Sequence, residues 1–301
     1  MHSKPNITVL CSLYHCETFL SSFLEALMAI EGKETIEVLL LHNAPSEKEL
    51  DILQPFLLKA DFVKHIIIPE RESLYRTWNR GIQISKGEYI TVWNVDDVRF
   101  PDSIIRQAEA LDNNPSAAVA YGDIWVSKKY GDKGKFCTHS PQYSDCPKAF
   151  LQSYFISCFQ MWRKSIHSEI GYYDEQFRCA ADFDFQIRAA LHFQFVKTSE
   201  PLGIYLEDQP HKLSANGLQQ LENNIIYLRY GAFHKINLFT LKTSKRQYRK
   251  EQILQFGEYR PLNESVHKNA FQTKCEWILC FATSIYKQFK YEYVKPFIRR
   301  L

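Results

Sequence analysis

The sequence predicts an α/β protein whose core is a mostly parallel sheet. Short runs of β-branched and apolar residues alternate with longer helical segments through the first 125 residues. Strands that alternate with helices in this way favour a parallel sheet covered by helices. Hydrophobic residues make up 45% and charged residues 24% of the 301-residue chain, which is enough apolar material to bury a sizeable core.

The predicted elements follow in chain order. Buried strands are expected at residues 7–11, 36–41, 62–68, 89–93 and 117–124. Helices are expected at residues 18–29, 73–85 and 101–113, with Thr18 as a cap and Pro101 in a first turn. Residues 127–148 are rich in Gly, Lys, Ser, Asp and Pro, which predicts a loop. A second block has a patterned run at 155–163, helices near 164–170 and 182–192, and strands near 195 and 202–205, and the chain from about residue 216 is expected to be helical.

Charge is distributed unevenly along the chain. The net charge is only +3, which gives no global field for binding nucleic acid. Residues 241–301 contain 13 Lys and Arg against 5 Asp and Glu, mixed with aromatic residues. A basic aromatic helix can lie on an anionic membrane. The same segment can equally cover the core or form an oligomer interface.

Cysteine usage and the chain ends predict a cytoplasmic protein. None of the eight cysteines forms a CxxC pair, and several lie in apolar runs, so we expect reduced thiols. The first six residues are polar and lead directly into a strand, which is not typical of a signal peptide. The apolar run at 277–286 is too short and too polar to span a bilayer.

Three polar sites follow predicted strands: residues 12–14, His42 with Asn43, and Asp96 with Asp97. In open α/β sheets, ligands bind beyond the carboxyl ends of the strands, so these sites are expected to converge. The paired carboxylates can hold a hard cation, Mn²⁺ or Mg²⁺, completed by substrate phosphates. The alternative is that the pair caps the helix that follows.

Residues 78–90, WNRGIQISKGEYI, followed by NVDD at 94–97, resemble the core signature of family 2 glycosyltransferases, which have the GT-A fold. Residues 9–15 resemble the first nucleotide-binding loop of that family. MWRKS at 161–165, IGYYDE at 170–175 and ADFDFQIR at 181–188 occur in the family's order. The resemblance covers residues 6 to 215. It implies a glycosyltransferase domain at 1–215, with a nucleotide-binding part at 1–125 and an acceptor part at 126–215, and a helical basic extension at 216–301.

The resemblance also implies roles for individual residues. Asp97 is expected to contact the metal, and Asp96 to contact the donor's sugar or ribose, or the metal through water. Asp182 is expected to be the general base, with Asp184 as its competitor. Ala181 stands where the family commonly has Glu, and Asn43 stands where it usually has Asp.

Further residues are expected around the donor. The donor-binding candidates are Ser12, Tyr14, Asn43, Arg76, Asn79 and Asp96. Arg71 is a further candidate, and both arginines rank below Asn43. His211 is a candidate for the metal or the diphosphate. One of four aromatic residues, Trp125, Trp162, Tyr172 and Tyr173, is expected to stack on a sugar ring.

The implied reaction is transfer of a hexosyl or N-acetylhexosaminyl group, with inversion, from a nucleotide-sugar, expected to be uridine-linked, to a glycan or lipid-linked acceptor in polysaccharide synthesis. The departures at Asn43 and Ala181 motivate one alternative, a catalytically weak GT-A-like binding or scaffold protein. A nucleotidyltransferase is a third hypothesis. It needs a Gly-rich basic phosphate loop, and residues 12–16 contain no glycine.

Overall fold

The computed structural model describes residues 6–207, 217–262 and 270–289. The chain forms two compact units. Unit 1 comprises Met1–Tyr173 and Phe185–Lys212, and unit 2 comprises Asp174–Asp184 and Leu213–Leu301. Each unit has its own architecture.

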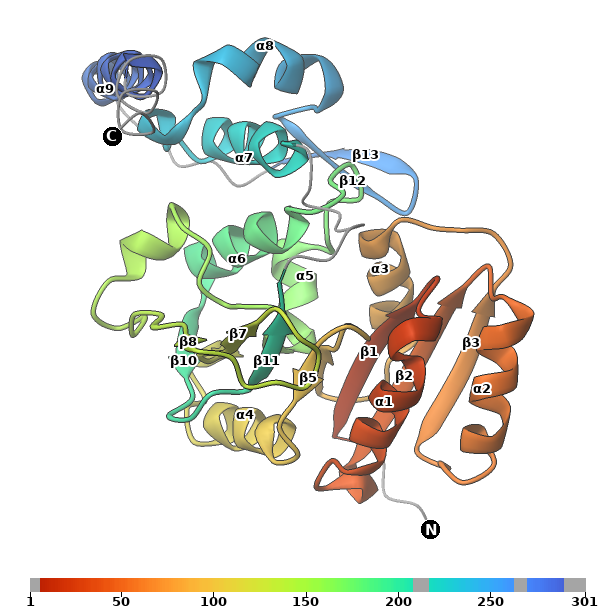
Figure 1. Ribbon diagram of the computed structural model, residues 1–301. Coiled ribbons are helices and arrows are strands. Elements are labelled where there is room, and N and C mark those ends of the chain that lie inside the picture. Colours follow the sequence, from red (N-terminus) through yellow and green to blue (C-terminus); the bar gives the residue numbers. More distant parts are fainter. Residues whose placement is uncertain (1–5, 208–216, 263–269, 290–301) are drawn as a thin grey trace, which may run out of the picture. The chain divides into compact units, whose positions relative to one another are not determined.

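A seven-stranded sheet forms the centre of unit 1 (Figure 1). Its order is β10-β6-β9-β4-β1-β2-β3. The strands are β1 (Ile7–Leu13), β2 (Ile36–Asn43), β3 (Val63–Ile68), β4 (Tyr89–Val92), β6 (Ala117–Tyr121), β9 (Met161–Arg163) and β10 (Gln194–Lys197). Only β9 runs antiparallel to its neighbours, so the mostly parallel sheet is confirmed.

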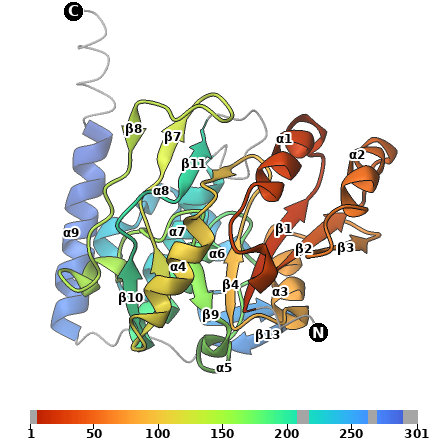
Figure 2. The same ribbon diagram turned by 90° about the horizontal axis from the view of Figure 1, so that it is seen from below.

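Helices cover both faces of this sheet. They are α1 (Glu17–Met28), α2 (Glu47–Leu57), α3 (Leu74–Ile84), α4 (Ser103–Asp112), α5 (His167–Ile170) and α6 (Ala181–His192). α1 and α2 lie on one face of β1–β3 and α3 on the other (Figure 2). All eight residues of β2 are buried, as is typical of a central strand covered on both faces, and residues 38–41 form its apolar centre.

Two helix starts differ from the expectation. α1 begins at Glu17 with Cys16 in the N-cap position, so Thr18 is not its cap. The sequence reading placed no helix at α2. There Ser46 and Glu49 form a capping box, in which each side chain bonds the backbone N–H of the other.

A second sheet in unit 1 has the order β5-β11-β7-β8. Its strands are β5 (Val98–Arg99), β7 (Trp125–Ser127), β8 (Phe136–Cys137) and β11 (Gly203–Leu206). β8 lies inside residues 127–148, which the sequence predicted as a loop, and it pairs antiparallel with β7 at the start of that segment. This small sheet brings β11 next to β5, directly after the two adjacent aspartates.

Two glycines of the family-like signature lie where a side chain does not fit. A Cβ on Gly87 would lie 2.6 Å from the backbone nitrogen of Thr8, and one on Gly81 would lie 2.7 Å from a methyl of Leu41. The N–H of Gly87 also donates to the Thr8 hydroxyl at 2.9 Å. These glycines therefore allow α3 and the start of β4 to approach β1 closely.

Unit 2 is built from helices and one hairpin. Its elements are α7 (Leu218–Arg229), the 3₁₀ turn η4 (Phe233–Lys235), α8 (Leu238–Gln247), β12 (Gln252–Gln255), β13 (Glu258–Pro261) and α9 (Ala270–Phe289). The expectation of a helical segment is wrong at the hairpin. Its two turn residues, Phe256 and Gly257, both have positive φ, as a type I′ turn requires. No helix within the described ranges is long and apolar enough to cross a membrane.

Candidate active site

The candidate site begins where the strand order changes direction in the sheet. β1 lies between β2 on one side and β4 on the other, and all three run parallel. The chain moves outward from β1 to β2 and β3, then crosses back to β4. Such a switch point leaves a crevice at the carboxyl ends of the strands, which is where ligands bind in this class of sheet.

Asp96 and Asp97 lie in the turn between β4 and β5, at this edge. The indole N–H of Trp93 donates to the Asp97 carbonyl at 3.0 Å, and the N–H of Asp97 donates to the Asn94 carbonyl at 3.1 Å. α4 begins later, at Ser103, with Asp102 in the N-cap position. The helix-cap reading of the pair is therefore wrong.

The two carboxylates have different environments. Asp97 is only 1% exposed, and its oxygens accept from the N–H of Leu206 at 3.1 Å and from the Asn94 amide at 3.2 Å. Asp96 is half-buried. Two adjacent carboxylates offer oxygen ligands of the kind that a hard cation prefers. Among the described residues, no group of three His, Cys, Asp or Glu is arranged to hold a metal.

Protonated groups surround the carboxylates. Burial raises the pKa of Tyr130 to about 12, and the charges of Asp97 and Asp96 act in the same direction. Burial, reinforced by these aspartates, also raises the pKa of Tyr205 and of Cys158. These three groups remain neutral at physiological pH, so the aspartates are the negative charges of this turn.

Arg99 lies behind the turn and was missed in the sequence. Its guanidinium donates to the carbonyls of Val92 and Phe159, each at 3.1 Å, and to the Gln107 amide oxygen at 2.9 Å. Burial lowers the pKa of Arg99 to about 9, although the charge of Asp97 opposes the shift. Arg99 thus ties the end of β4 to α4 and to the loop before β9.

The loop after β1 carries two of the predicted donor contacts. Ser12 is half-buried at the end of β1, and Tyr14 lies in the loop with the Arg71 guanidinium 4.2 Å above its ring. His15 adopts a positive φ of 47°. A non-glycine residue in this region is strained, which is common where a loop is shaped for a ligand.

Glu49 anchors this loop from α2, and the sequence reading did not identify it. Its carboxylate accepts from the N–H of Cys16 at 2.8 Å, from the Cys16 thiol at 3.2 Å and from the N–H of Ser46 at 2.9 Å. Its other near neighbour is His42, whose Nε2 lies 3.2 Å away. Burial acts to raise the pKa of Glu49, but these hydrogen bonds outweigh it and lower the pKa to about 2.

Asn43 and Asn79 are buried and bonded within the protein. Asn43 donates to the Thr77 hydroxyl at 3.0 Å and accepts from the N–H of Glu72 at 2.9 Å. The Asn79 amide makes two 2.9 Å bonds with the backbone N–H and carbonyl of Tyr173. In the structure both side chains join chain segments rather than face a cleft.

Arg76 lies on the surface of α3, where it pairs with Glu72 at 3.3 Å. Trp162 and Tyr173 are fully buried, and Tyr172 stacks on His167. Trp125 is half-buried with Lys133 over its ring at 4.8 Å. His211 lies outside the described residues.

Asp182 and Asp184 lie in the first turn of α6, in unit 2. Asp184 is fully buried, and its carboxylate accepts from Arg229 at 2.7 Å and from the Tyr230 hydroxyl at 2.9 Å. Arg229 also pairs with Asp174 at 2.7 Å. Asp182 is half-buried, and it accepts from the N–H of Phe183 at 2.8 Å.

Glu222 holds the segment that leads into α6. Its buried carboxylate accepts from three successive backbone N–H groups, those of Arg178 at 2.7 Å, Cys179 at 2.9 Å and Ala180 at 2.9 Å. The Tyr248 hydroxyl adds a fourth bond at 3.1 Å. This carboxylate therefore fixes the backbone immediately before Asp182.

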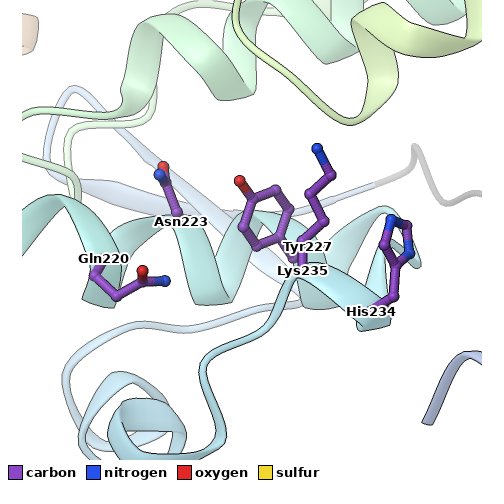
Figure 3. Close-up of a pocket in the computed structure, with 5 residues that line it drawn as sticks. All are labelled: Gln220, Asn223, Tyr227, His234 and Lys235. Atoms are coloured by element: carbon purple, nitrogen blue, oxygen red, sulfur yellow. The ribbon is translucent and has the colours of Figure 1, made fainter. Parts of the chain in front are cut away.

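A polar pocket of about 390 Å³ opens on α7 and η4 in unit 2 (Figure 3). Gln220, Asn223 and Tyr227 line it at helical spacing, and His234 and Lys235 complete it. The Tyr227 ring packs edge-on against Phe183, at 5.9 Å between ring centroids. Tyr227, which lines the pocket, therefore packs directly on the residue that follows Asp182.

Comparison with known proteins gives the family. The model of glycosyl transferase family 2 matches residues 8–171, more than half of the chain. An uncharacterised glycosyltransferase of Methanocaldococcus jannaschii is 23% identical over 189 residues, covering 62% of this chain and 64% of that protein. A PGL/p-HBAD biosynthesis glycosyltransferase of Mycobacterium tuberculosis is 24% identical over 157 residues, covering 50% and 57%. The chain thus spans less than two thirds of either relative.

Solved structures share the fold at low sequence identity. S. aureus TarS in complex with UDP-GlcNAc superposes with a TM-score of 0.60 at 13% identity, covering 80% of this chain and 79% of that one. The mannosyltransferase PcManGT of Pyrobaculum calidifontis, with GDP-Man and Mn²⁺, gives 0.54 at 11% identity, covering 75% and 63%. With the family match and the α/β sheet described above, these likenesses lead to one conclusion: the chain belongs to glycosyl transferase family 2 and has the GT-A fold.

Proposed function

We propose that this protein is an inverting glycosyltransferase that moves a hexosyl or N-acetylhexosaminyl group from a nucleotide-sugar to a glycan or lipid-linked acceptor in polysaccharide synthesis. The observation that carries the proposal is the Asp96–Asp97 turn at the switch point of the sheet. A uridine-linked donor is supported by the fold shared with TarS, which binds UDP-GlcNAc. The donor GDP-Man of the Pyrobaculum mannosyltransferase is the main competitor.

Burial supports metal contact by Asp96 rather than by Asp97. The motif order assigned direct metal contact to Asp97, but Asp97 is 1% exposed and both of its oxygens accept N–H bonds. In our proposal the half-buried Asp96 presents its carboxylate to Mn²⁺ or Mg²⁺, and Asp97 fixes the turn. A bound cation would neutralise the charge of the leaving diphosphate. His211 remains a proposed additional ligand.

Tyr14 and Ser12 contact the donor in this proposal, with Arg71 and Arg76 as candidate cations for its phosphates. Asn43 and Asn79 act indirectly, because their amide groups are used inside the protein. Asn43 holds the chain after β3 against α3, and Asn79 holds α3 against Tyr173.

Asp182 is the general base of the proposed reaction. It takes the proton of an acceptor hydroxyl as that oxygen bonds to the anomeric carbon, while the bond to the nucleoside diphosphate breaks on the opposite face of the sugar. The choice of Asp182 over Asp184 is supported by exposure. Asp184 is fully buried against Arg229 and has no path to an acceptor proton.

The polar pocket of unit 2 is the proposed acceptor subsite. The amides of Gln220 and Asn223 can each donate and accept, which suits the hydroxyls of a sugar. Lys235 adds a positive charge, which suits an acceptor with a phosphate or carboxylate. Figure 3 shows Asn223, Tyr227 and Lys235 extending to the same side of the pocket.

The test is a screen of nucleotide-sugars with and without Mn²⁺, read by thermal stabilisation and by donor hydrolysis. Stabilisation by one nucleoside diphosphate sugar that needs the metal is the expected result. Asp96→Asn should remove it, and Asp182→Asn should keep it but lose transfer. The exposed Asp61→Asn is the matched control. Metal-dependent binding with no transfer by the wild type would favour the catalytically weak scaffold, and no binding at all would reject both functions.

A further inference from the structure

Helix α9 carries an unusual pattern of exposure within unit 2. One face packs inward: Trp277 stacks on Phe233 with ring centroids 5.0 Å apart, and the buried Cys280 thiol donates to the Ile236 carbonyl at 3.4 Å. Glu276 accepts from the His234 ring at 2.6 Å. These contacts fix which side of α9 faces η4.

The opposite side of α9 is apolar and exposed. Five large side chains are each between 52% and 64% exposed: Ile278, Leu279, Phe281, Ile285 and Tyr286. Ile278, Phe281 and Ile285 follow helical spacing, so they line up along the helix. We call these five residues the α9 stripe. A cluster of this kind on a chain surface marks an interaction site rather than ordinary exposure.

We propose that the α9 stripe lies in the interface of an anionic lipid membrane. Among the residues of α9 whose side chains are described, Lys274 is the only charged one that is exposed. From residue 287 onward the sequence adds Lys287, Lys290, Lys295, Arg299 and Arg300 against the single acidic Glu292. A helix with an apolar face and neighbouring basic residues binds anionic lipid both by burying apolar surface and by electrostatic attraction.

A second copy of the chain is the competing occupant of the stripe. A parallel pairing of two stripes would bring together the two basic sequences that follow them, which is unfavourable. Phosphate headgroups neutralise the same charges instead. No helix of the described ranges is both long and apolar enough to cross a bilayer, and α9 is apolar on one side only, which favours a position along the membrane surface.

Membrane binding by the α9 stripe is independent of the transfer reaction and is tested without it. The full chain is mixed with phosphatidylcholine vesicles, with or without phosphatidylglycerol, and bound protein is separated by flotation. We expect binding to the anionic vesicles alone, weakened by added salt. Replacing Ile278 and Ile285 by Ser together should reduce partitioning by at least about tenfold, since about 1.4 kcal/mol suffices for that change.

The matched control is Leu58→Ser with Ile67→Ser, two aliphatic residues of unit 1 that are 84% and 52% exposed. This pair should float like the wild type, and circular dichroism should show both double variants folded. Absence of wild-type binding, equal binding to neutral vesicles, or an unchanged α9 variant would each overturn the proposal. A wild-type dimer that dissociates in the α9 variant, without vesicle binding, would assign the stripe to a second copy.

Discussion

Glu222→Gln should destabilise unit 2 and slow transfer without weakening donor binding. One Glu222 oxygen accepts from the N–H of Arg178, and the other accepts from the N–H groups of Cys179 and Ala180. Whichever oxygen becomes the amide NH₂, at least one buried backbone N–H loses its acceptor. Each orphaned donor costs about 1–3 kcal/mol, and the remaining bonds lose their charge assistance, so we expect about 2–4 kcal/mol in total.

The assay is thermal unfolding together with transfer kinetics, once a donor is identified. We expect a lower Tm, a reduced kcat and an unchanged donor KM, because the segment held by Glu222 precedes Asp182 whereas the proposed donor contacts are in unit 1. Glu258→Gln is the control, since that carboxylate is 75% exposed. A Glu222→Gln protein with wild-type Tm and kcat would show that the carboxylate does not position the base.

Three further predictions follow from buried contacts. The pKa of Glu49 is lowered from 4.5 to about 2, so its stabilising effect is present above pH 4.5 and is lost as the pH falls toward 2; acid titration of unfolding should show a shallower loss in Glu49→Gln. Asp184→Asn should lower Tm because it breaks a buried ion pair, while Asp182→Asn should leave Tm nearly unchanged and abolish transfer. Gly87→Ala should lower Tm more than Gly81→Ala, because its Cβ would meet backbone rather than movable leucine methyls, and equal Tm values would contradict this.

The regular elements of unit 1 could be predicted because each is marked locally. Apolar runs predicted the strands of the sheet, and Gly87 of the motif predicted where β4 begins. α2 was missed although the Ser46–Glu49 capping box is a local signal. The hairpin turn was missed because Phe256 occupies a positive-φ position where Asn or Gly is usual.

The candidate site was only partly predictable, since its supports depend on contacts far apart in the chain. Glu222 bonds residues more than 40 positions away, and Arg229 pairs with Asp174 across 55 positions. A single sequence contains no local mark for such pairs. The motif did locate Asp96 and Asp97, but one of the hydrogen bonds that hold Asp97 comes from Leu206 of β11, 109 residues away.

Glu49 and Glu222 have the same structural role at two loops. Each is a fully buried carboxylate on one helix that collects backbone N–H groups just before another helix, at Cys16 before α1 and at Cys179 before α6. Each also accepts the thiol of that cysteine at 3.2 Å. Burial, reinforced by the neighbouring carboxylate, raises the pKa of both thiols, so neither forms a reactive thiolate near neutral pH.

Because each carboxylate holds one cysteine, the alkylation rates of Cys16 and Cys179 report whether Glu49 and Glu222 hold their loops. In the native protein an alkylating reagent should modify the exposed Cys275 first and leave Cys16 and Cys179 intact, as read by peptide mass spectrometry. Glu222→Gln should raise the alkylation rate of Cys179 and leave that of Cys16 unchanged, because each anchor holds its own loop. Equal rates at all three thiols in the wild type would mean that the loops open freely. In that case the carboxylates could not hold the backbone beside Tyr14 and Asp182 in place.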